Sequence, residues 1–247
     1  MGIFKALSNL AAKSNELAGQ AEFQKIYSSL SKAEVIADGQ FHKRNFWRGK
    51  AKEFKAVNLT KKLALSSLRS FVAFDVETTG IPLSGTAVIE LSAVRFDDFQ
   101  PTELFTTLIN PQMPIPREAS EINHIYNYMV KKAPVFHQII PSFEQFIGER
   151  PLAAHNAEFD VSHLYVNGLD CIVNKKVFDT CSISRKLCKG LLNHKLATSC
   201  ANYNIYFNGA HRASADALAC GMLFVQELMQ YYSCKSVQEL QQAANDK

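Results

Sequence analysis

Two acidic residues, Asp75 and Glu77, end an apolar run, FVAFDVETTG, that the sequence predicts to be a strand. Because side chains alternate along a strand, both carboxylates project from the same face. The run is apolar on both faces, as in a central strand covered on both sides. Burying paired carboxylates there is costly without a partner, and a divalent cation is the natural one. A solvated strand end carrying two surface acids is the alternative, which this motif alone leaves open.

Two further acids lie in segments of helical character. Asp160 occurs in AAHNAEFDVSHL, at the start of a predicted helix, where the helix dipole alone would favour an acid. Asp216 occurs in HRASADALACGMLF, five residues after His211 and among small residues that leave room for a ligand. A histidine and an acid at this spacing are often a structural pair. Each segment is therefore weak evidence when taken alone.

The three segments together follow the motif order of a known family. The patterns D-x-E-x-T-G (75–80), H-N-x-x-F-D (155–160) and H-x-A-x-x-D (211–216) resemble the DnaQ-like, or DEDDh, exonucleases. This family includes the epsilon subunit of bacterial replicative polymerase, RNase T and oligoribonuclease. The resemblance runs from about Phe71 to Met229. One departure is that many members read H-G-I-T where this chain has Asn123, His124, Ile125 and Tyr126. The resemblance implies a metal-dependent 3′-to-5′ exonuclease.

The resemblance also implies a role for each acid. Asp75, Glu77 and Asp216 would hold one Mg²⁺ or Mn²⁺ ion, with Asp75 bridging to a second ion that Asp160 supports, partly through water. Two ions about 4 Å apart can activate an attacking water and stabilise the departing 3′-oxygen. His211 would take the proton from that water, since histidine side chains ordinarily titrate near neutral pH.

Five more residues are candidates for binding substrate. Thr78, Thr79 and Gly80 follow the acidic pair and, by the resemblance, would hold the sugar of the terminal nucleotide. Asn156 and Phe159 are candidates for orienting the scissile phosphate and packing against a base. For Phe159 a core position is supported at least as well, because aromatic residues on a helix stripe usually pack inward.

The elements that must position these residues predict an α/β fold. Three strand-like runs cover residues 70–77, 86–96 and 102–110 and are joined by short turns, which indicates an antiparallel meander. Short strands are expected at 152–154 and 177–178, and together with the helices they indicate β-α-β units. With the resemblance, this is an RNase H-like mixed sheet flanked by helices. The helices are expected near residues 117–123, 135–148, 158–167, 181–188, 194–203 and 213–231.

We expect three segments along the chain. Residues 1–68 form an N-terminal extension, residues 69–235 the exonuclease domain and residues 236–247 a C-terminal helical tail. Residues 2–66 contain no proline and have apolar residues at helical spacing, which predicts that the extension is helical.

The net charge of +4 is unevenly distributed. Residues 42–62 hold eight Lys or Arg and one acid, a net +7 that leaves about −3 for the rest of the chain. This basic segment surrounds the only tryptophan, Trp47, and we expect it to bind the backbone of the substrate strand. Equally supported is a helix that docks on the nuclease domain through Phe46, Ala51, Phe54 and Val57, with its lysines in water. The extension is also a candidate site for a protein partner.

The six cysteines all lie in the last third of the chain and show no C-x-x-C pair or zinc-site spacing, which indicates reduced thiols. No run approaches the ~20 apolar residues of a membrane span, and the first residues lack a long apolar segment. We therefore expect a cytoplasmic protein with no membrane contact.

The motifs do not distinguish DNA from RNA. We expect the 3′ end of DNA as the substrate, in proofreading or repair. An RNA-directed exonuclease or oligoribonuclease is the first alternative. The second is a nuclease-like nucleic-acid-binding subunit without turnover, which is less favoured because all five catalytic positions are filled.

Overall fold

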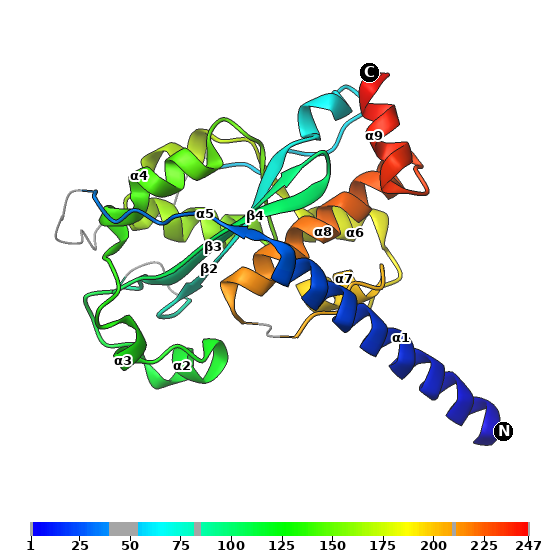
Figure 1. Ribbon diagram of the computed structural model, residues 1–247, viewed down its shortest axis with the longest axis horizontal. Helices are drawn as coiled ribbons and strands as arrows, with labels where there is room; N and C mark the ends of the chain where they lie inside the picture. The colour runs from blue at the N-terminus through cyan, green and yellow to red at the C-terminus, as the bar shows by residue number, and fades with distance from the viewer. Residues whose placement is uncertain (1, 40–53, 82–84, 209–210, 247) are drawn as a thin grey trace.

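The computed structural model describes residues 2–39, 54–81, 85–208 and 211–246, with side chains in the first helix from Ala12 onward. Within these ranges the chain forms a six-stranded mixed sheet with helices on both faces (Figure 1). The predicted α/β class is confirmed. The strands lie in the order β1 (Ser31–Lys32), β4 (Gln100–Leu108), β3 (Val88–Asp97), β2 (Phe71–Thr78), β5 (Leu152–Ala154) and β6 (Val177–Asp179).

The centre of the sheet is the predicted antiparallel meander. Strand β3 pairs antiparallel with both β2 and β4, whereas β5 runs parallel to β2 and to β6. In the β2–β3 register Asp75 lies opposite Ser92, and Glu77 lies opposite Glu90. The short strand β1, which pairs parallel with β4, was not predicted, because two residues carry no periodic signal.

The two faces of β2 contribute to two different apolar cores. Phe71 and Ala73 pack toward the long helix α8 (Ala213–Tyr232), and Val72 and Phe74 pack toward the opposite face of the sheet. Strand alternation therefore sets Asp75 and Glu77 on the α8 face. Gly221 allows α8 to approach closely, since a Cβ there would lie 2.1 Å from the Phe96 ring.

The remaining helices lie within a few residues of their predicted positions, apart from α3 (Asn127–Val130), a single turn that was not predicted. Their bounds are α2 Arg117–Asn123, α4 Phe136–Ile147, α5 Ala157–Val166, α6 Thr180–Leu187, α7 Leu196–Ala201 and α9 Val237–Asn245, with 3₁₀ turns at Leu65–Leu68 and Asp170–Asn174. Helices α4 and α5 cover the sheet on the face opposite α8.

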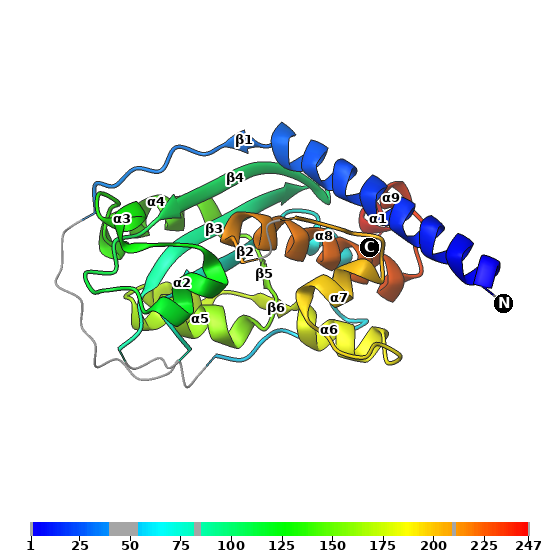
Figure 2. The same ribbon diagram turned by 90° about the horizontal axis from the view of Figure 1, so that it is seen from below.

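The N-terminal extension is helical only in its first part. Helix α1 spans Gly2–Ser29 and leaves the domain beside α8 (Figure 2). The predicted helix from residue 30 onward is wrong where the structure describes it. The segment from Phe54 is extended, and the Val57 N–H donates to the Val177 carbonyl at 2.8 Å, because β6 offers it unpaired backbone groups. A docked helix through Phe54 and Val57 is therefore also wrong, whereas Phe46, Trp47 and Ala51 lie outside the described residues.

The extension and the tail share one core with the central domain. Phe23 and Leu30 from the N-terminal side and Leu240 and Ala244 from α9 pack in the same apolar cluster as Phe71.

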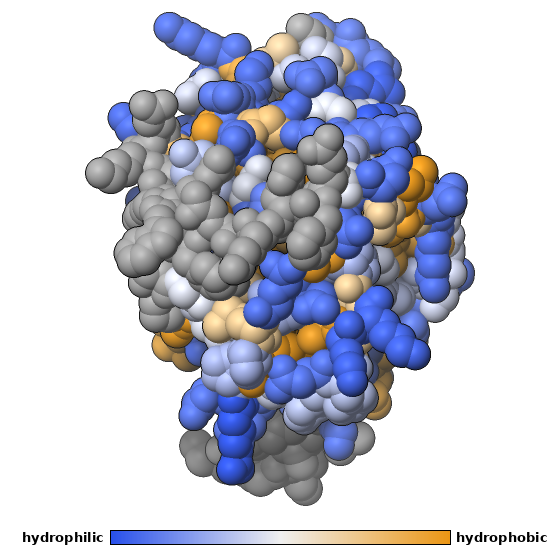
Figure 3. All heavy atoms as spheres, turned by 90° about the vertical axis from the view of Figure 1, so that its left-hand side faces the viewer, coloured by the Kyte–Doolittle hydropathy of each residue, from blue (hydrophilic) through white to orange (hydrophobic). Residues whose placement is uncertain are grey.

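The face that carries α3 and α4 is mainly hydrophilic where it is described, with apolar side chains in small separate groups (Figure 3). Among the described helices, none combines the length and apolar character that crossing a bilayer requires.

Candidate active site

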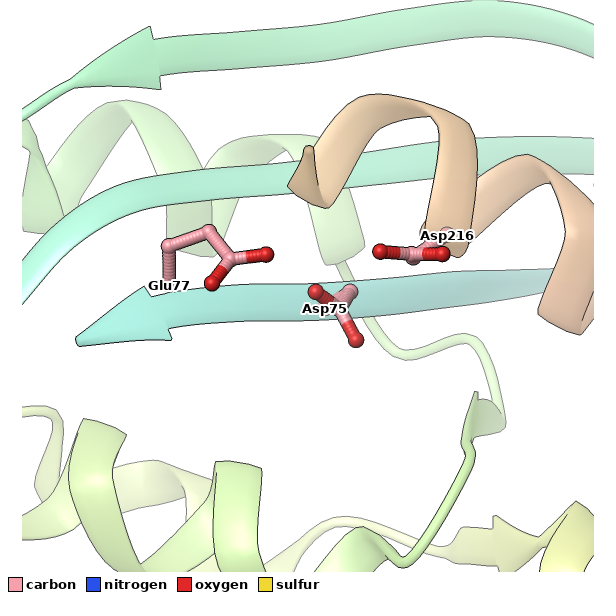
Figure 4. A group of neighbouring side chains, drawn as sticks. All are labelled: Asp75, Glu77 and Asp216. Atoms are coloured by element: carbon pink, nitrogen blue, oxygen red, sulfur yellow. The ribbon is translucent and has the colours of Figure 1, made fainter. Parts of the chain in front are cut away.

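Three carboxylates converge between β2 and the first turn of α8. Asp75 and Glu77 point from β2 toward Asp216, which α8 directs back at the strand (Figure 4). One oxygen from each of these side chains lies within 4.8 Å of the others. Carboxylate oxygens at such separations match the ligands that Mg²⁺ and Mn²⁺ prefer, so this group could hold a divalent cation.

Asp160 approaches the same strand from α5. Its side chain is buried, and Oδ1 accepts a hydrogen bond from the Val76 N–H at 3.2 Å. Asp160 lies outside the group of three whose oxygens are mutually close. It is near enough to Asp75 for its charge to raise the pKa of that carboxyl. The structure thus brings all four predicted acids to one end of β2.

The four acids have raised pKa values. Burial is the largest cause for each, and repulsion between the carboxylates adds to it. The pKa of Glu77 rises to about 8 and that of Asp160 to about 8, although the Val76 N–H opposes the rise for Asp160. For Asp216 the rise is to about 7, opposed by the His211 N–H. The pKa of Asp75 lies well above its ordinary value. A bound cation would favour the ionised form of every one of these groups.

A fifth acid, Glu90, was missed by the sequence analysis. It is 2% exposed and receives two hydrogen bonds from Arg212, Nη2 to Oε1 at 2.7 Å and Nε to Oε2 at 3.1 Å. The Ala213 N–H also donates to Oε2 at 3.1 Å. This pairing fixes the start of α8 against β3, and the Glu90 hydrogen bond raises the pKa of Arg212. An acid inside the apolar run AVIELSAV was the signal that could have revealed it.

His211 lies at the turn that precedes α8. The residue is exposed, and its backbone has φ of 68°, in the left-handed region. Its N–H donates to Asp216 Oδ2 at 2.9 Å. The turn is therefore tied directly to a carboxylate of the convergent group.

The turn after β2 uses several of its own polar groups. The Thr79 hydroxyl accepts from the Ala87 N–H at 2.8 Å, so it is occupied within the protein. Thr78 Oγ1 donates to the Gly80 carbonyl at 2.8 Å. Asn123, from the segment that departs from the family pattern, donates its Nδ2 to the Thr78 carbonyl at 3.3 Å. The contacts predicted for Thr78, Thr79 and Gly80 with a sugar stay predictions.

Asn156 and Phe159 lie at the start of α5. Asn156 is exposed with φ of 66°, and its N–H donates to Asp179 Oδ1 at 2.8 Å. Phe159 is half-buried against the core below α4, and its ring centroid lies 4.2 Å from that of His163. The core position considered for Phe159 thus gains support, and the side chain of Asn156 is the more accessible of the two.

His155 of the second motif has a structural environment. Its Nδ1 lies 2.8 Å from Thr180 Oγ1, and its Nε2 lies 2.8 Å from the His194 carbonyl oxygen. Burial lowers the pKa of this imidazole. Asp179 caps α6 by accepting from the Cys181 N–H at 3.1 Å. These residues connect β5 and β6 to the helices that follow them.

A family model described as "Exonuclease" and named RNase_T matches residues 72–224, which hold every acid and the histidine described above. The chain belongs to this exonuclease family. The resemblance to DnaQ-like exonucleases is thereby confirmed, and the chain is an exonuclease domain with additional segments before residue 72 and after residue 224.

Bacterial polymerase proteins are among the similar sequences. The DNA polymerase III subunit epsilon of Treponema pallidum is 38% identical over 160 residues, which cover 63% of this chain and 74% of the relative. A PolC-type DNA polymerase III of Caldanaerobacter subterraneus subsp. tengcongensis is 36% identical over 174 residues, 69% of this chain. The match covers only 12% of that polymerase.

Solved structures of exonucleases share the fold. Exonuclease X in complex with 5′ overhanging duplex DNA superposes with a TM-score of 0.53 at 20% identity, over 70% of this chain and 99% of the other. The nuclease domain of 3′hExo, a DEDDh family member bound to rAMP, gives a TM-score of 0.56 at 14% identity, over 68% and 94% of the two chains. The predicted RNase H-like architecture is therefore confirmed.

Proposed function

We propose that this chain hydrolyses the terminal phosphodiester bond at the 3′ end of a DNA strand and releases nucleoside monophosphates. The observation that carries the proposal is the convergence of Asp75, Glu77 and Asp216 between β2 and α8, with Asp160 beside them. Acids that raise one another's pKa in this way are a poor arrangement for stability and a good one for binding cations.

Two divalent cations, Mg²⁺ or Mn²⁺, are the proposed cofactors. Asp75, Glu77 and Asp216 would hold one, and Asp75 and Asp160 the other. When bound, the cations would neutralise charge on the phosphate, lower the pKa of the attacking water and stabilise the leaving oxygen. The oxygen donors fit this assignment, because Mg²⁺ and Mn²⁺ prefer carboxylate oxygens over sulfur or nitrogen.

His211 would act as the general base. Its exposed position in the turn before α8, close in the chain to Asp216, would allow the imidazole to accept a proton from the attacking water. The hydrogen bond from the His211 N–H to Asp216 holds the residue close to a proposed cation ligand. Thr78, Thr79, Gly80 and Asn156 would orient the terminal nucleotide. Phe159 would have a smaller part, because its side chain packs partly in the core.

The preference for DNA is supported by the relatives, since both the epsilon subunit and the PolC-type protein are named as parts of DNA polymerase III. For the same reason we propose a cytoplasmic protein that acts with a protein partner. Residues 1–68 are the proposed site for that partner, and residues 69–235 and 236–247 remain the proposed exonuclease domain and tail.

The test is digestion of oligonucleotides labelled at the 5′ end, with DNA and RNA of matched sequence in parallel arms. Mg²⁺ or Mn²⁺ should produce a ladder that shortens from the 3′ end, and EDTA should stop it. DNA should be cleaved faster than RNA. Faster cleavage of RNA would replace the proposed substrate, and degradation that persists in EDTA would contradict the proposed mechanism.

The basic segment, residues 42–62, has a separate test, and much of it lies outside the described residues. Removing everything before Leu68 is a poor experiment, because Phe23 and Leu30 belong to the core. Replacing the segment's lysines by glutamine keeps that core. If the lysines bind phosphates, log K against log salt should become shallower by about 0.7 to 0.9 for each phosphate that is no longer bound. An unchanged slope would indicate that the segment serves a protein partner instead.

A further inference from the structure

One face of α1 lies against the segment that leads to His211. Gly19, Phe23 and Tyr27 recur at intervals of four residues, so they lie on the same side of the helix. This helix precedes the part of the chain that the exonuclease family model matches, which begins at residue 72. The catalytic motifs give no reason for such a contact.

The approach is closest at Gly19. A Cβ at this position would lie 2.5 Å from Cδ2 of Tyr206 and 3.1 Å from the Asn204 carbonyl oxygen. Real Cβ atoms do not come so near, so a side chain at Gly19 would displace the Tyr206 ring or move α1 away. Glycine costs about 0.5–1 kcal/mol relative to alanine inside a helix. Here it permits the helix to contact the 204–208 segment directly.

Two further contacts continue along the same face. The Phe23 ring is 3% exposed and lies 5.4 Å from the Phe207 ring, centroid to centroid. One turn later, the Tyr27 hydroxyl lies 2.9 Å from Ser214 Oγ. Phe207 comes shortly before His211, and Ser214 lies between His211 and Asp216. Helix α1 therefore contacts the chain on both sides of His211.

The turn at His211 needs such support. His211 is exposed and has a left-handed backbone conformation, which residues other than glycine adopt uncommonly. A hydrogen bond to Asp216 holds its N–H. The contacts of Gly19 and Phe23 with residues 204–207 hold the part of the chain that leads to this turn. Misplacement of a reacting group by about 1 Å can lower a rate about 10²-fold.

We propose that α1 is a positioning element of the active site, in which Phe23 and Tyr27 hold the turn that carries His211 in its reactive geometry. The proposal rests on the proposed function, because it assigns α1 an effect on the step in which His211 takes a proton.

The first test compares substitutions on α1 in the full chain. Phe23→Ala should lower kcat by about 10-fold to 100-fold and leave KM within about threefold, because the turn is displaced while the remaining substrate contacts persist. Phe23→Leu should recover most of the rate. Tyr27→Phe, which removes only the hydroxyl, should lower kcat by about 3-fold to 10-fold. Glu22→Ala, an exposed neighbour of Phe23, is the matched control and should behave as the unmodified chain.

The second test is a double-mutant cycle with His211→Ala. If α1 acts through His211, Phe23→Ala should cause less than about a threefold further loss of rate once the imidazole has been removed. An equal loss of rate in both backgrounds would overturn the proposal and make Phe23 a general packing residue. An unchanged kcat in Tyr27→Phe and in folded Phe23→Ala would also overturn it. An unmodified chain without activity would refute the proposed function itself, whereas an active chain with an indifferent α1 would refute this inference alone.

Discussion

Helix α8 carries a buried acid near each end, and the two have opposite surroundings. Asp216, in the first turn, faces Asp75 and Glu77 and accepts the His211 N–H. Glu227, near the other end, is completely buried, and neither carboxylate oxygen has a hydrogen-bond partner among the described residues. Burial raises the pKa of Glu227 well above 4.5, with smaller effects from Cys188 and Asp179.

The difference teaches that a raised pKa does not by itself indicate a functional acid. Both carboxyls are penalised by burial, which favours their neutral form. Asp216 lies beside Asp75 and Glu77 of β2, and one cation could bind all three carboxylates and offset the repulsion between them. At Glu227 the rise comes mainly from burial, which favours the neutral form, and no described group donates a hydrogen bond to its carboxylate. Convergence is therefore the feature that distinguishes the candidate site.

The most direct test of this difference is to neutralise one acid at each end of α8. Asp216→Asn or Asp75→Asn should abolish hydrolysis, since a cation ligand is removed. Glu227→Gln should leave kcat within about threefold, because it lies eleven residues and about 16 Å further along the helix axis. Single-turnover rates with excess protein provide the measurement. Metal-dependent cleavage by folded Asp216→Asn would contradict the assignment of the site.

A second comparison separates the base from the cation ligands at the N-terminal end of α8. His211→Ala should lower kcat by about 10²-fold to 10⁴-fold, since a general base contributes on that scale. Calorimetric titration with Mn²⁺ should give an unchanged affinity, in contrast to Asp75→Asn. Loss of Mn²⁺ binding in His211→Ala would show that the imidazole is a ligand.

The rise in Tm on adding metal should also distinguish a substitution at the convergent acids from one at Glu227. At a concentration 100 times its Kd, a cation that binds only the folded protein adds about 2.7 kcal/mol of stability. Mg²⁺ or Mn²⁺ should therefore raise the Tm of the unmodified chain and of Glu227→Gln by a similar amount, but not that of Asp75→Asn. Equal shifts in all three proteins would place the cation elsewhere.

The smallest expected effect concerns stability against pH at Glu227. A raised pKa means that the folded state holds a proton that the unfolded state releases above its own pKa, so stability falls as the pH rises through that interval. Glu227→Gln has no such proton. Its advantage over the unmodified chain should grow by up to about 1.4 kcal/mol per pH unit above pH ~4.5. Urea unfolding at several pH values measures it, and a constant difference would show that Glu227 is ionised when folded.

Much of this arrangement could be predicted from the sequence. The period of two in residues 70–77 sets Asp75 and Glu77 on one face, and the motif order implies that Asp160 and Asp216 meet them. The role of Glu90 was missed because its partner Arg212 lies 122 residues further along the chain, so the pairing depends on how α8 packs on β3. Glu227 resembles an ordinary helix residue until the helices around α8 are placed. The extended course of Phe54 to Val57 was likewise set by a distant partner, the backbone of β6.

The N-terminal extension covers both borders of the sheet formed by β4, β3, β2, β5 and β6. Ser31 and Lys32 pair with β4 on one side, and Val57 pairs with β6 on the other. Outermost strands expose unpaired backbone groups that recruit strands from other molecules, and natural proteins cover them for this reason. A fragment that begins at residue 69 would leave both borders bare. Such a fragment should self-associate into oligomers in a concentration-dependent way.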